Sequence, residues 1–421
     1  MTQFSDIASN DPLYLTALAN LGANIPAKLI AAPAKGSIAV LPFVNSSGDA
    51  SQDSFTDGLT EDIITDLSNV PGFFVIARNS SFAYKGKPSD VRQVAHDLGV
   101  KYILEGSSRR SGQKLRINVQ LIDAAESGNH IWAERFDREL ADIFDVQDEV
   151  TRRIVEAISG KLNAGSGPER YRPSNLEAYD LCVRSRNLWS LSKTLNSEAH
   201  ALLIRAAMLE PNYAEVHWQL ALVHLFQWIY WGGEPEPTRN IAHESAQHAV
   251  ELDPNDSSAR WVLGFVLFHE GRSEEANAQL DQSIRMNPND ADALAIYSDL
   301  KVAAELPAEA MEFVARALRL NPRPPPWYYW MLGQAQVACG HYGDAVKTLR
   351  REETYRTGSR RILAAALALS GHLEQAREEA RFFLSDNPGF RIANWTRSGF
   401  FWSPNVVKFW TDAYRLAGLP D

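Results

Sequence analysis

Apolar and polar residues follow two different patterns along this chain of 421 residues, and the change lies near residue 170. Before it, short apolar runs such as Ile38–Phe43 alternate with segments in which apolar residues recur at helical spacing, as Leu59, Ile63 and Leu67 do. Short apolar runs bounded by turn residues are typical of strands, and a 3.6-residue spacing is typical of helices. The first part therefore predicts strands and helices in alternation. The second part has no convincing strand-like run and predicts helices alone.

The predicted N-terminal domain ends in three strand-like runs and a helix. The second of these runs, Leu115–Leu121, alternates apolar and polar residues with a period of two, as a half-buried strand does. The turn at Ser127–Gly128 predicts a hairpin into the run 131–136, and a helix from about Phe144 to Leu162 closes the domain. The order β-α-β-α-β-β-β-α predicts a small α/β domain with a mixed sheet.

One short phrase recurs in the helical part: Leu or Met, then an acidic residue or Asn, then Pro. It ends at Pro211, Pro254, Pro288 and Pro322, at spacings of 43, 34 and 34 residues. A period of 34 residues with small residues in its helices resembles the tetratricopeptide repeat, a helix–turn–helix unit that stacks into a solenoid. The predicted fold class is thus an α/β N-terminal domain followed by an all-α tetratricopeptide solenoid.

Two helices of one repeat can cross closely only where small residues sit at the crossing, and proline then stops the second helix. The positions that we assign to packing and turns are Trp261, Leu263, Gly264, Gly271, Ala276, Pro288, Gly333, Ala345, Gly371 and Ala376. About six copies fit the sequence, at roughly 180–213, 214–256, 257–290, 291–324, 326–356 and 357–390. A stable stack needs at least three copies, so six suffice.

The second copy is nine residues longer than the 34-residue period and carries the run Trp228–Pro235. Insertions in solenoids map to loops, so we expect a loop there. A last helix, Asn405–Ala417, is expected to cap the stack. The predicted organisation is a helix (Pro12–Leu21) and linker in 1–36, the α/β domain in 37–162, a linker in 163–173, the solenoid in 174–400 and the cap in 401–421.

Charge and composition narrow the classes of partner and the cell compartment. The formal net charge is −10, and nucleic-acid binding needs a basic surface, so we expect no nucleic-acid partner. The first eleven residues contain no Lys or Arg, and no stretch is apolar enough to span a bilayer, so we expect neither export nor membrane insertion. Cys182 and Cys339 are expected to be buried free thiols. These features favour the cytoplasm.

Several phrases of the N-terminal domain resemble a bacterial TolB-like N-terminal domain. They are Ile38–Phe43 with Asn45, Gly58–Asp62, Arg78–Gly86, Leu104–Ser107 and Ile131–Glu134. The resemblance implies a domain that commonly precedes tetratricopeptide repeats, and the pair often follows a class III adenylate/guanylate cyclase or a winged-helix DNA-binding domain. The 36 residues before the first strand are too few for either module. The resemblance therefore implies a signalling context without the enzymatic activity.

The sequence offers no catalytic or cofactor-binding pattern that outweighs a structural explanation. It has no phosphate-binding loop, and His243 and His248 are five residues apart, so their rings diverge on a helix instead of sharing a face for zinc. Asp57, Glu61, Asp62 and Asp66 form a run of acids, three of which we place in the first turns of a helix, where acids complement the macrodipole. We therefore expect no cofactor, no metal site and no enzymatic activity.

Two groups of residues are candidates for contacting a partner. Arg109 and Arg110, with Lys114 and Arg116, form a small basic patch around the Ser111–Gly112 turn, which is either a solvated turn or a site for an acidic partner or a phosphate. The aromatic candidates, which are either repeat core or anchors at an interface, are Trp228, Tyr230, Trp231, Trp327, Tyr328 and Trp330. Four consecutive aromatics, 327–330, cannot all face inward on one helix, and exposed aromatics favour interfaces.

Three functional hypotheses follow. The first is a non-catalytic adaptor that grips a protein or peptide on the concave face of the solenoid. The second is the regulatory, non-catalytic portion of a nucleotide-cyclase system, which the family resemblance implies. The third is a small-ligand sensor in the TolB-like domain.

Overall fold

The computed structural model describes residues 36–125, 128–159, 171–186, 188–190, 192–229, 234–351, 359–398 and 402–421. The chain divides into two units. The first, here called the N-terminal unit, holds the described residues up to 267 together with 274–290, and the second, the C-terminal unit, holds 268–273 and 291–421. The predicted helix at 12–21 and the linker residues 163–170 lie outside the described residues.

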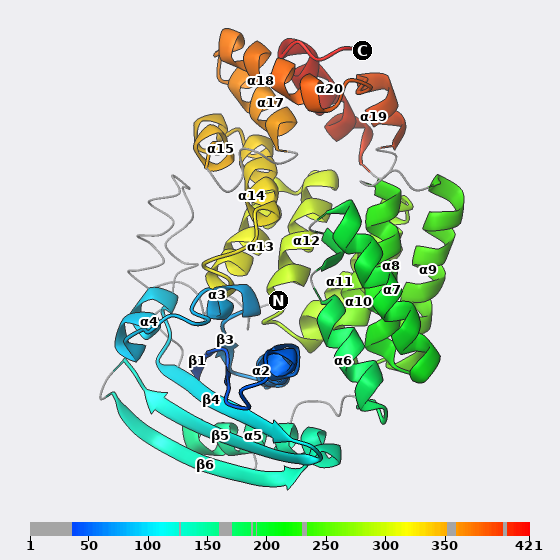
Figure 1. The fold of residues 1–421 in the computed structure, drawn as a ribbon. Helices are drawn as coiled ribbons and strands as arrows, with labels where there is room; N and C mark the ends of the chain where they lie inside the picture. The colour runs from blue at the N-terminus through cyan, green and yellow to red at the C-terminus, as the bar shows by residue number, and fades with distance from the viewer. Residues whose placement is uncertain are drawn as a thin grey trace. The chain divides into compact units, whose positions relative to one another are not determined.

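A mixed sheet forms the base of the N-terminal unit (Figure 1). Its strands run in the order β3-β1-β4-β5-β6, with β1 parallel to both β3 and β4, and with β4, β5 and β6 antiparallel. The short β2 pairs with β4 in parallel. The bounds are β1 Ser37–Val40, β2 Val44–Asn45, β3 Phe74–Val75, β4 Tyr102–Ser111, β5 Lys114–Asp123 and β6 Asn129–Glu139. The predicted mixed sheet is confirmed.

Helices pack on both faces of this sheet. On one face, α2 (Asp53–Ser68) and α5 (Ile143–Ser159) bury residues such as Ile63 and Val150 against the apolar side of β4 and β5. On the other face, α4 (Val91–Leu98) forms a separate apolar cluster with the strands. Gly99 ends α4 with φ of 63°, the left-handed conformation expected at this position.

Short elements were missed at the sequence level. The helix α3 (Arg78–Phe82), the 3₁₀ turns at 50–52 and 140–142, and β2 each span only two to five residues. Periodicity needs a longer window than this, since a helix repeats only every 3.6 residues.

Three helical hairpins belong to the N-terminal unit. Residues 268–273 of the third hairpin, at its turn, are assigned to the C-terminal unit. Their helices are α6 Leu176–Ser185, α7 Lys193–Leu209, α8 Ala214–Ile229, α9 Pro235–Leu252, α10 Ser257–His269 and α11 Ser273–Met286. Asn175 caps α6 and Ser192 caps α7 through their side-chain oxygens. Each of these helix pairs overlaps one of the first three predicted copies of the repeat.

Three further hairpins make up most of the C-terminal unit. They are α12 Ala291–Ala303 with α13 Pro307–Leu320, α14 Trp327–Ala338 with α15 Tyr342–Leu349, and α17 Arg360–Leu369 with α18 Leu373–Asp386. After them come α19 Ile392–Ser398, which was not predicted, and α20 Pro404–Leu416, which was. The α20 residues Trp410 and Tyr414 are buried in one cluster with α17, so α20 covers the last hairpin.

The long second hairpin differs from its prediction. α8 has 16 residues and α9 has 18, whereas α10 has 13 and α11 has 14. Most of the extra length therefore extends the two helices, and the expectation of a loop insertion was wrong for Trp228, which belongs to α8. Tyr230 and Trp231 lie outside the described residues.

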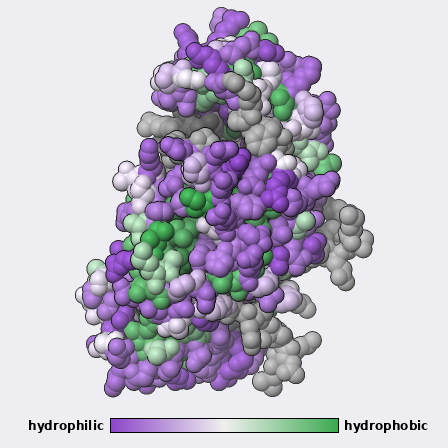
Figure 2. Space-filling view, turned by 90° about the vertical axis from the view of Figure 1, so that its right-hand side faces the viewer, coloured by the Kyte–Doolittle hydropathy of each residue, from purple (hydrophilic) through white to green (hydrophobic). Residues whose placement is uncertain are grey.

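Hydrophilic side chains cover most of the face that Figure 2 draws, and hydrophobic side chains gather on it only in smaller patches. Among the described residues, no helix is long and apolar enough to cross a membrane.

Candidate functional site

The residues assigned to repeat packing occupy helix crossings and turns. A Cβ atom on Gly264 would lie 2.9 Å from Leu280 Cγ, and one on Gly333 would lie 2.6 Å from Leu349 Cδ2, so both positions need glycine for the helices to approach. The other packing residues are buried: Trp261, Leu263, Ala276, Ala345 and Ala376. Gly271 and Gly371 adopt positive φ in the hairpin turns, and Pro288 follows the end of α11.

The aromatic candidates separate into core and partly exposed residues. Tyr328 is fully buried, and its hydroxyl donates a hydrogen bond to Asp292 Oδ1 at 2.6 Å. Its proposed contact with a partner is therefore wrong, because the side chain belongs to the core between α12 and α14. Trp228, Trp327 and Trp330 are half-buried and remain candidates.

The predicted basic patch is divided between the two faces of the sheet. Arg109 is exposed and pairs in the ladder with Arg116, whose Nε donates to Asp137 Oδ1 at 2.6 Å. Arg110 points to the opposite face, where its guanidinium lies 6.0 Å from the centroid of the Phe55 ring. The two arginines thus do not form one site.

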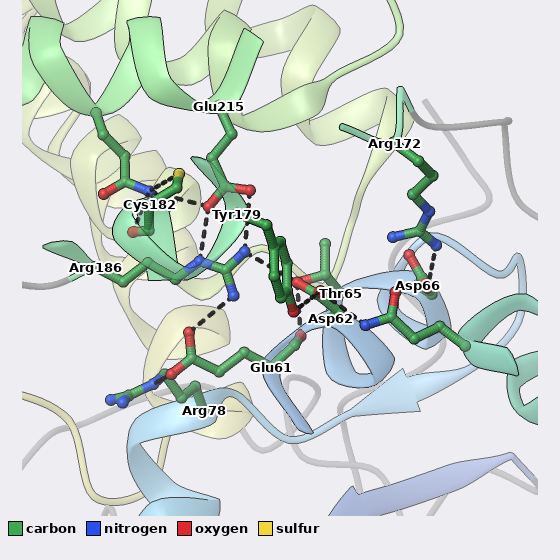
Figure 3. A network of polar contacts seen from close by, with 12 residues as sticks. Glu61, Asp62, Thr65, Asp66, Arg78, Arg172, Tyr179, Cys182, Arg186 and Glu215 are labelled. Atoms are coloured by element: carbon green, nitrogen blue, oxygen red, sulfur yellow. Dashed lines mark hydrogen bonds and ion pairs between the residues drawn. The ribbon is translucent and has the colours of Figure 1, made fainter. Parts of the chain in front are cut away.

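The guanidinium of Arg186, at the end of α6, lies in a buried polar network of the N-terminal unit (Figure 3). It donates to Glu61 at 3.2 Å, to Asp62 at 3.0 Å and to Glu215 at 2.7 Å. All four side chains are at most 11% exposed. Interaction with three carboxylates holds the pKa of Arg186 well above its usual value despite burial. The cation therefore stays charged inside the protein.

Asp62 is shared with two further donors. The Tyr179 hydroxyl donates to Asp62 Oδ2 at 2.6 Å, and Gln147 Nε2 donates to the same oxygen at 3.0 Å. Burial, followed by the charge of Asp62, raises the pKa of Tyr179 well above its usual value, so the phenol remains a donor. Residues of α2, α5 and α6 thus meet at one carboxylate.

Two more acids of α2 bind cations. Asp66 accepts from Arg172 at 2.7 Å, and Asp57 accepts from Lys85 at 2.6 Å. Since α2 begins at Asp53, only Asp53 lies in its first turn. The macrodipole explanation for Asp57, Glu61 and Asp62 was therefore wrong. These acids neutralise basic side chains from other elements instead.

A second polar attachment joins the third hairpin to the α/β domain. Asn289, just after α11, donates from Nδ2 to the carbonyl oxygens of Ser68 and Phe73 at 2.9 and 3.1 Å. Asn287 donates to Ser68 Oγ at 3.0 Å. Together with Arg186, these contacts hold α6 and α11 against the α/β domain. Sequence reasoning missed them, because nothing in the spacing of Arg186 or Asn289 marks a partner more than a hundred residues away.

The polar side chains of these clusters bond mainly to one another, although the buried Gln147 Oε1 has no hydrogen-bond partner in the described part of the chain. Among the described residues, no group of three or more His, Cys, Asp or Glu side chains could hold a metal ion. His217 and His248 meet edge to face at a centroid distance of 4.6 Å, and His217 Nε2 lies 2.7 Å from the Pro211 carbonyl oxygen. Cys182 is buried as expected, whereas Cys339 is only half-buried.

A family model described as the second domain of HilA/YgeH-like transcriptional regulators matches residues 34–153. The match covers most of the α/β domain and less than half of the chain. This family differs from the TolB-like family that the sequence phrases resemble. Membership of the TolB-like family is therefore a proposal.

Among curated proteins, the chain is similar to a protein of Rhizobium meliloti (strain 1021) named "Putative adenylate cyclase 3", with 48% identity over 261 residues. The matched region is 61% of this chain and 44% of that protein. The chain thus spans less than half the length of this relative.

Solved structures give partial likenesses. PilF of Pseudomonas aeruginosa is 19% identical with a TM-score of 0.37, and covers 51% of this chain and 95% of its own. A tetratricopeptide protein of Thermus thermophilus is 20% identical with a TM-score of 0.37, and covers 45% of this chain and 98% of its own. TolB of Acinetobacter baumannii is 20% identical with a TM-score of 0.23, and covers 31% of this chain and 29% of its own. With TM-scores this low, we draw no functional conclusion from them.

Proposed function

We propose that this chain is a non-catalytic adaptor whose helical hairpins hold a protein or peptide partner. The observation that carries the proposal is the series of hairpins, α6–α7 through α17–α18, joined to a sequence period of 34 residues. Within the N-terminal unit α7 packs on α8, and within the C-terminal unit α13 packs on α14 and α15 packs on α17. Stacked hairpins of this kind create extended concave surfaces that bind partners. We propose the cytoplasm as the site of action.

The first helices of neighbouring hairpins supply the proposed binding surface. In the C-terminal unit, Gln334 Nε2 of α14 lies 3.3 Å from Asp299 Oδ1 of α12, so these two first helices face each other. Asp299 of α12 and Trp330 of α14 are both half-buried, and an acidic side chain and an aromatic ring each suit a partner that carries a basic side chain.

Site-specific photo-crosslinking of the full chain in native lysate tests this function. A benzophenone side chain at Asp299 or Trp330 probes the first helices, and matched positions Glu309 and Lys347 probe the second helices α13 and α15. We expect one defined protein to crosslink from the first-helix positions and not from the others. The proposal fails if no protein crosslinks, or if the second-helix positions capture the same protein equally.

A second candidate function is the regulatory, non-catalytic part of a class III adenylate/guanylate cyclase system. The relative named "Putative adenylate cyclase 3" supports it, as does the TolB-like resemblance of the N-terminal domain. A cyclase as the crosslinked partner would favour this function over a generic adaptor. Incubation of the chain alone with ATP or GTP and Mn²⁺ should yield no cyclic nucleotide, and formation of product would overturn the non-enzymatic proposal.

A further inference from the structure

One face of the β4–β5 hairpin changes character along its length. At one end, Ile103 and Ile122 face α4 and belong to its apolar cluster. Side chains alternate between faces, so the same face continues at every second residue. The continuation consists of two cross-strand pairs of polar residues, Glu105 opposite Gln120 and Ser107 opposite Asn118. Four polar side chains thus lie together where the apolar cluster ends.

A bulge in the neighbouring strand opens a space beside these four residues. Between the pairs Val40–Leu104 and Val44–Ser107, the β1–β2 segment advances four residues while β4 advances three. The extra residue turns Phe43 into the core on the α2 face, where its amide donates to Thr60 Oγ1 at 3.0 Å. Bulges of this kind commonly lie next to functional sites.

The space is a cavity of about 480 Å³. The polar residues of β4 and β5 form one wall, Leu41, Pro42 and Val44 form another, and the segment from Tyr84 to Pro88 closes a third side. Binding sites for small molecules typically measure about 300–1,000 Å³ and combine apolar walls with a few polar groups. The cavity has the size and the mixed lining of such a site.

The topology of the sheet also marks this place. β1 is connected through α2 to β3 on one side and pairs with β4 on its other side, and α2 and α4 cover opposite faces. The connection that leaves β1 through α2 and the connection that enters β4 through α4 therefore run on opposite faces of the sheet, and they diverge between β1 and β4. In open α/β sheets, ligands bind at such a switch point, beyond the carboxyl ends of the strands. Leu41 and Pro42 follow the carboxyl end of β1 directly.

Glu105 decides the chemistry of the cavity. Its side chain is half-buried, and no described residue donates a hydrogen bond or forms an ion pair with its carboxylate. Burial raises the pKa of Glu105, and the charge of His130 acts in the opposite direction. Lys87, the cation of the lining, donates to the Ala83 carbonyl oxygen at 2.7 Å. A desolvated carboxylate without a donor favours a cationic ligand.

We propose that this cavity binds a small primary amine, with its ammonium group on Glu105. The amides of Asn118 and Gln120 hydrogen-bond a polar group elsewhere on the ligand, and Leu41, Pro42 and Val44 pack against its apolar part. A free anion is disfavoured, because it would lie beside the Glu105 carboxylate. The site does not rest on the proposed adaptor function, since it lies entirely on the α/β domain.

Calorimetric titration of the full chain with tyramine tests the site. Tyramine carries an ammonium group, an apolar ring and a hydroxyl, and its neutral analogue 4-(2-hydroxyethyl)phenol differs only at the amine. We expect tyramine to bind, and the neutral analogue to bind at least tenfold more weakly. Failure of tyramine to bind at millimolar concentration, or equal affinity for the two compounds, overturns the proposal.

Three variants separate the site from general effects of charge and folding. Glu105→Gln should weaken tyramine binding at least tenfold, while Glu139→Gln, which removes an exposed carboxylate on β6, should leave it unchanged. Val44→Trp should block binding by filling the mouth, since Val44 is 63% exposed and its substitution leaves the core intact. Unaltered tyramine affinity in both Glu105→Gln and Val44→Trp would place the ligand elsewhere and refute the site.

Discussion

At the scale of single residues, Gly333 shows how the repeat depends on a missing side chain. Its α-carbon faces Leu349 of α15 so closely that a Cβ would lie 2.6 and 2.7 Å from Leu349 Cδ2 and Cγ. Leu349 is fully buried and cannot move aside freely. We expect Gly333→Ala to lower the free energy of unfolding by about 1–3 kcal/mol through overpacking, as measured by urea denaturation.

Gly343, in the helix α15, is the matched control for Gly333. A Cβ at this position would meet no atom within 4 Å. Alanine is favoured over glycine in a helix by about 0.5–1 kcal/mol, so Gly343→Ala should stabilise the protein slightly. A loss of stability in both variants would show that the close crossing at Gly333 is not the cause.

Asp299 offers a test through pH. Burial raises its pKa to about 7, and the hydrogen bond from Gln334 only partly offsets this. The folded state therefore binds the proton more tightly than the unfolded state, whose carboxyl keeps its usual pKa of 3.8. Stability contributed by protonated Asp299 is present below pH 3.8 and is lost as the pH rises through about 7.

Asp299→Asn should remove this dependence. We expect the free energy of unfolding of the variant to exceed that of the wild type by about 1–2 kcal/mol at pH 8 and to match it near pH 4. The expected difference is smaller than the full pKa shift would give, because the side chain is partly exposed. Thermal unfolding at several pH values measures the difference. Asp386→Asn, at an exposed carboxylate, should show no such pH-dependent gain. An equal gain at pH 4 and pH 8 would contradict the assigned cause.

At the scale of elements, the sequence was sufficient where a segment repeats its pattern several times. The strand Lys114–Asp123 and the helices of the hairpins follow their apolar periodicity closely. The prediction failed for α3, with five residues, and for the run Trp228–Ile229, where extra residues prolong α8. In both places the outcome depends on packing between elements, which local periodicity does not contain.

Arg186 is the residue through which α6 and α8 are fixed to α2. Three carboxylates surround its guanidinium, so its removal takes a cation away from three buried acids, of which Glu61 also pairs with Arg78. Breaking a buried ion pair from one side costs about 3–5 kcal/mol. We expect Arg186→Met to lower the free energy of unfolding by this amount in urea denaturation.

The pair Arg205–Glu177, between α7 and α6, is the natural comparison. These side chains are 64% and 56% exposed, and exposed pairs contribute only about 0–1 kcal/mol. Arg205→Met should therefore lower the free energy of unfolding much less than Arg186→Met does. Equal losses would mean that burial of the Arg186 network does not determine how much the network stabilises the protein.

At the scale of the whole molecule, the sequence changes near residue 170 from mixed strands and helices to helices alone. Hydrogen bonds of Arg186 and Asn289 nevertheless join residues on the two sides of that position. Asp62 and Arg186 are 124 residues apart in sequence, and Ser68 and Asn289 are 221 apart. Each of these residues has an ordinary local role, as a helix acid, a helix end or a turn. Only the folded chain brings them together, so neither attachment could be inferred from spacing.

A fragment of residues 33–290 should therefore behave as one cooperative body, although it crosses the predicted boundary. It keeps Arg186 on Glu61 and Asp62, and Asn289 on the carbonyl oxygens of Ser68 and Phe73. A fragment of residues 33–170 loses both attachments and takes Arg186 away from Glu61 and Asp62, although Glu61 keeps its ion pair with Arg78. We expect the Tm of this shorter fragment to lie about 10 °C or more below that of the longer one, since each kcal/mol shifts the Tm of a domain this size by several degrees.

Calorimetry of both fragments measures this difference, with Arg186→Met in the longer fragment as the intermediate case. If the shorter fragment melts at the same temperature as the longer one, the α/β domain is independent of the hairpins, and the contacts at Arg186 and Asn289 only dock two bodies that are already stable.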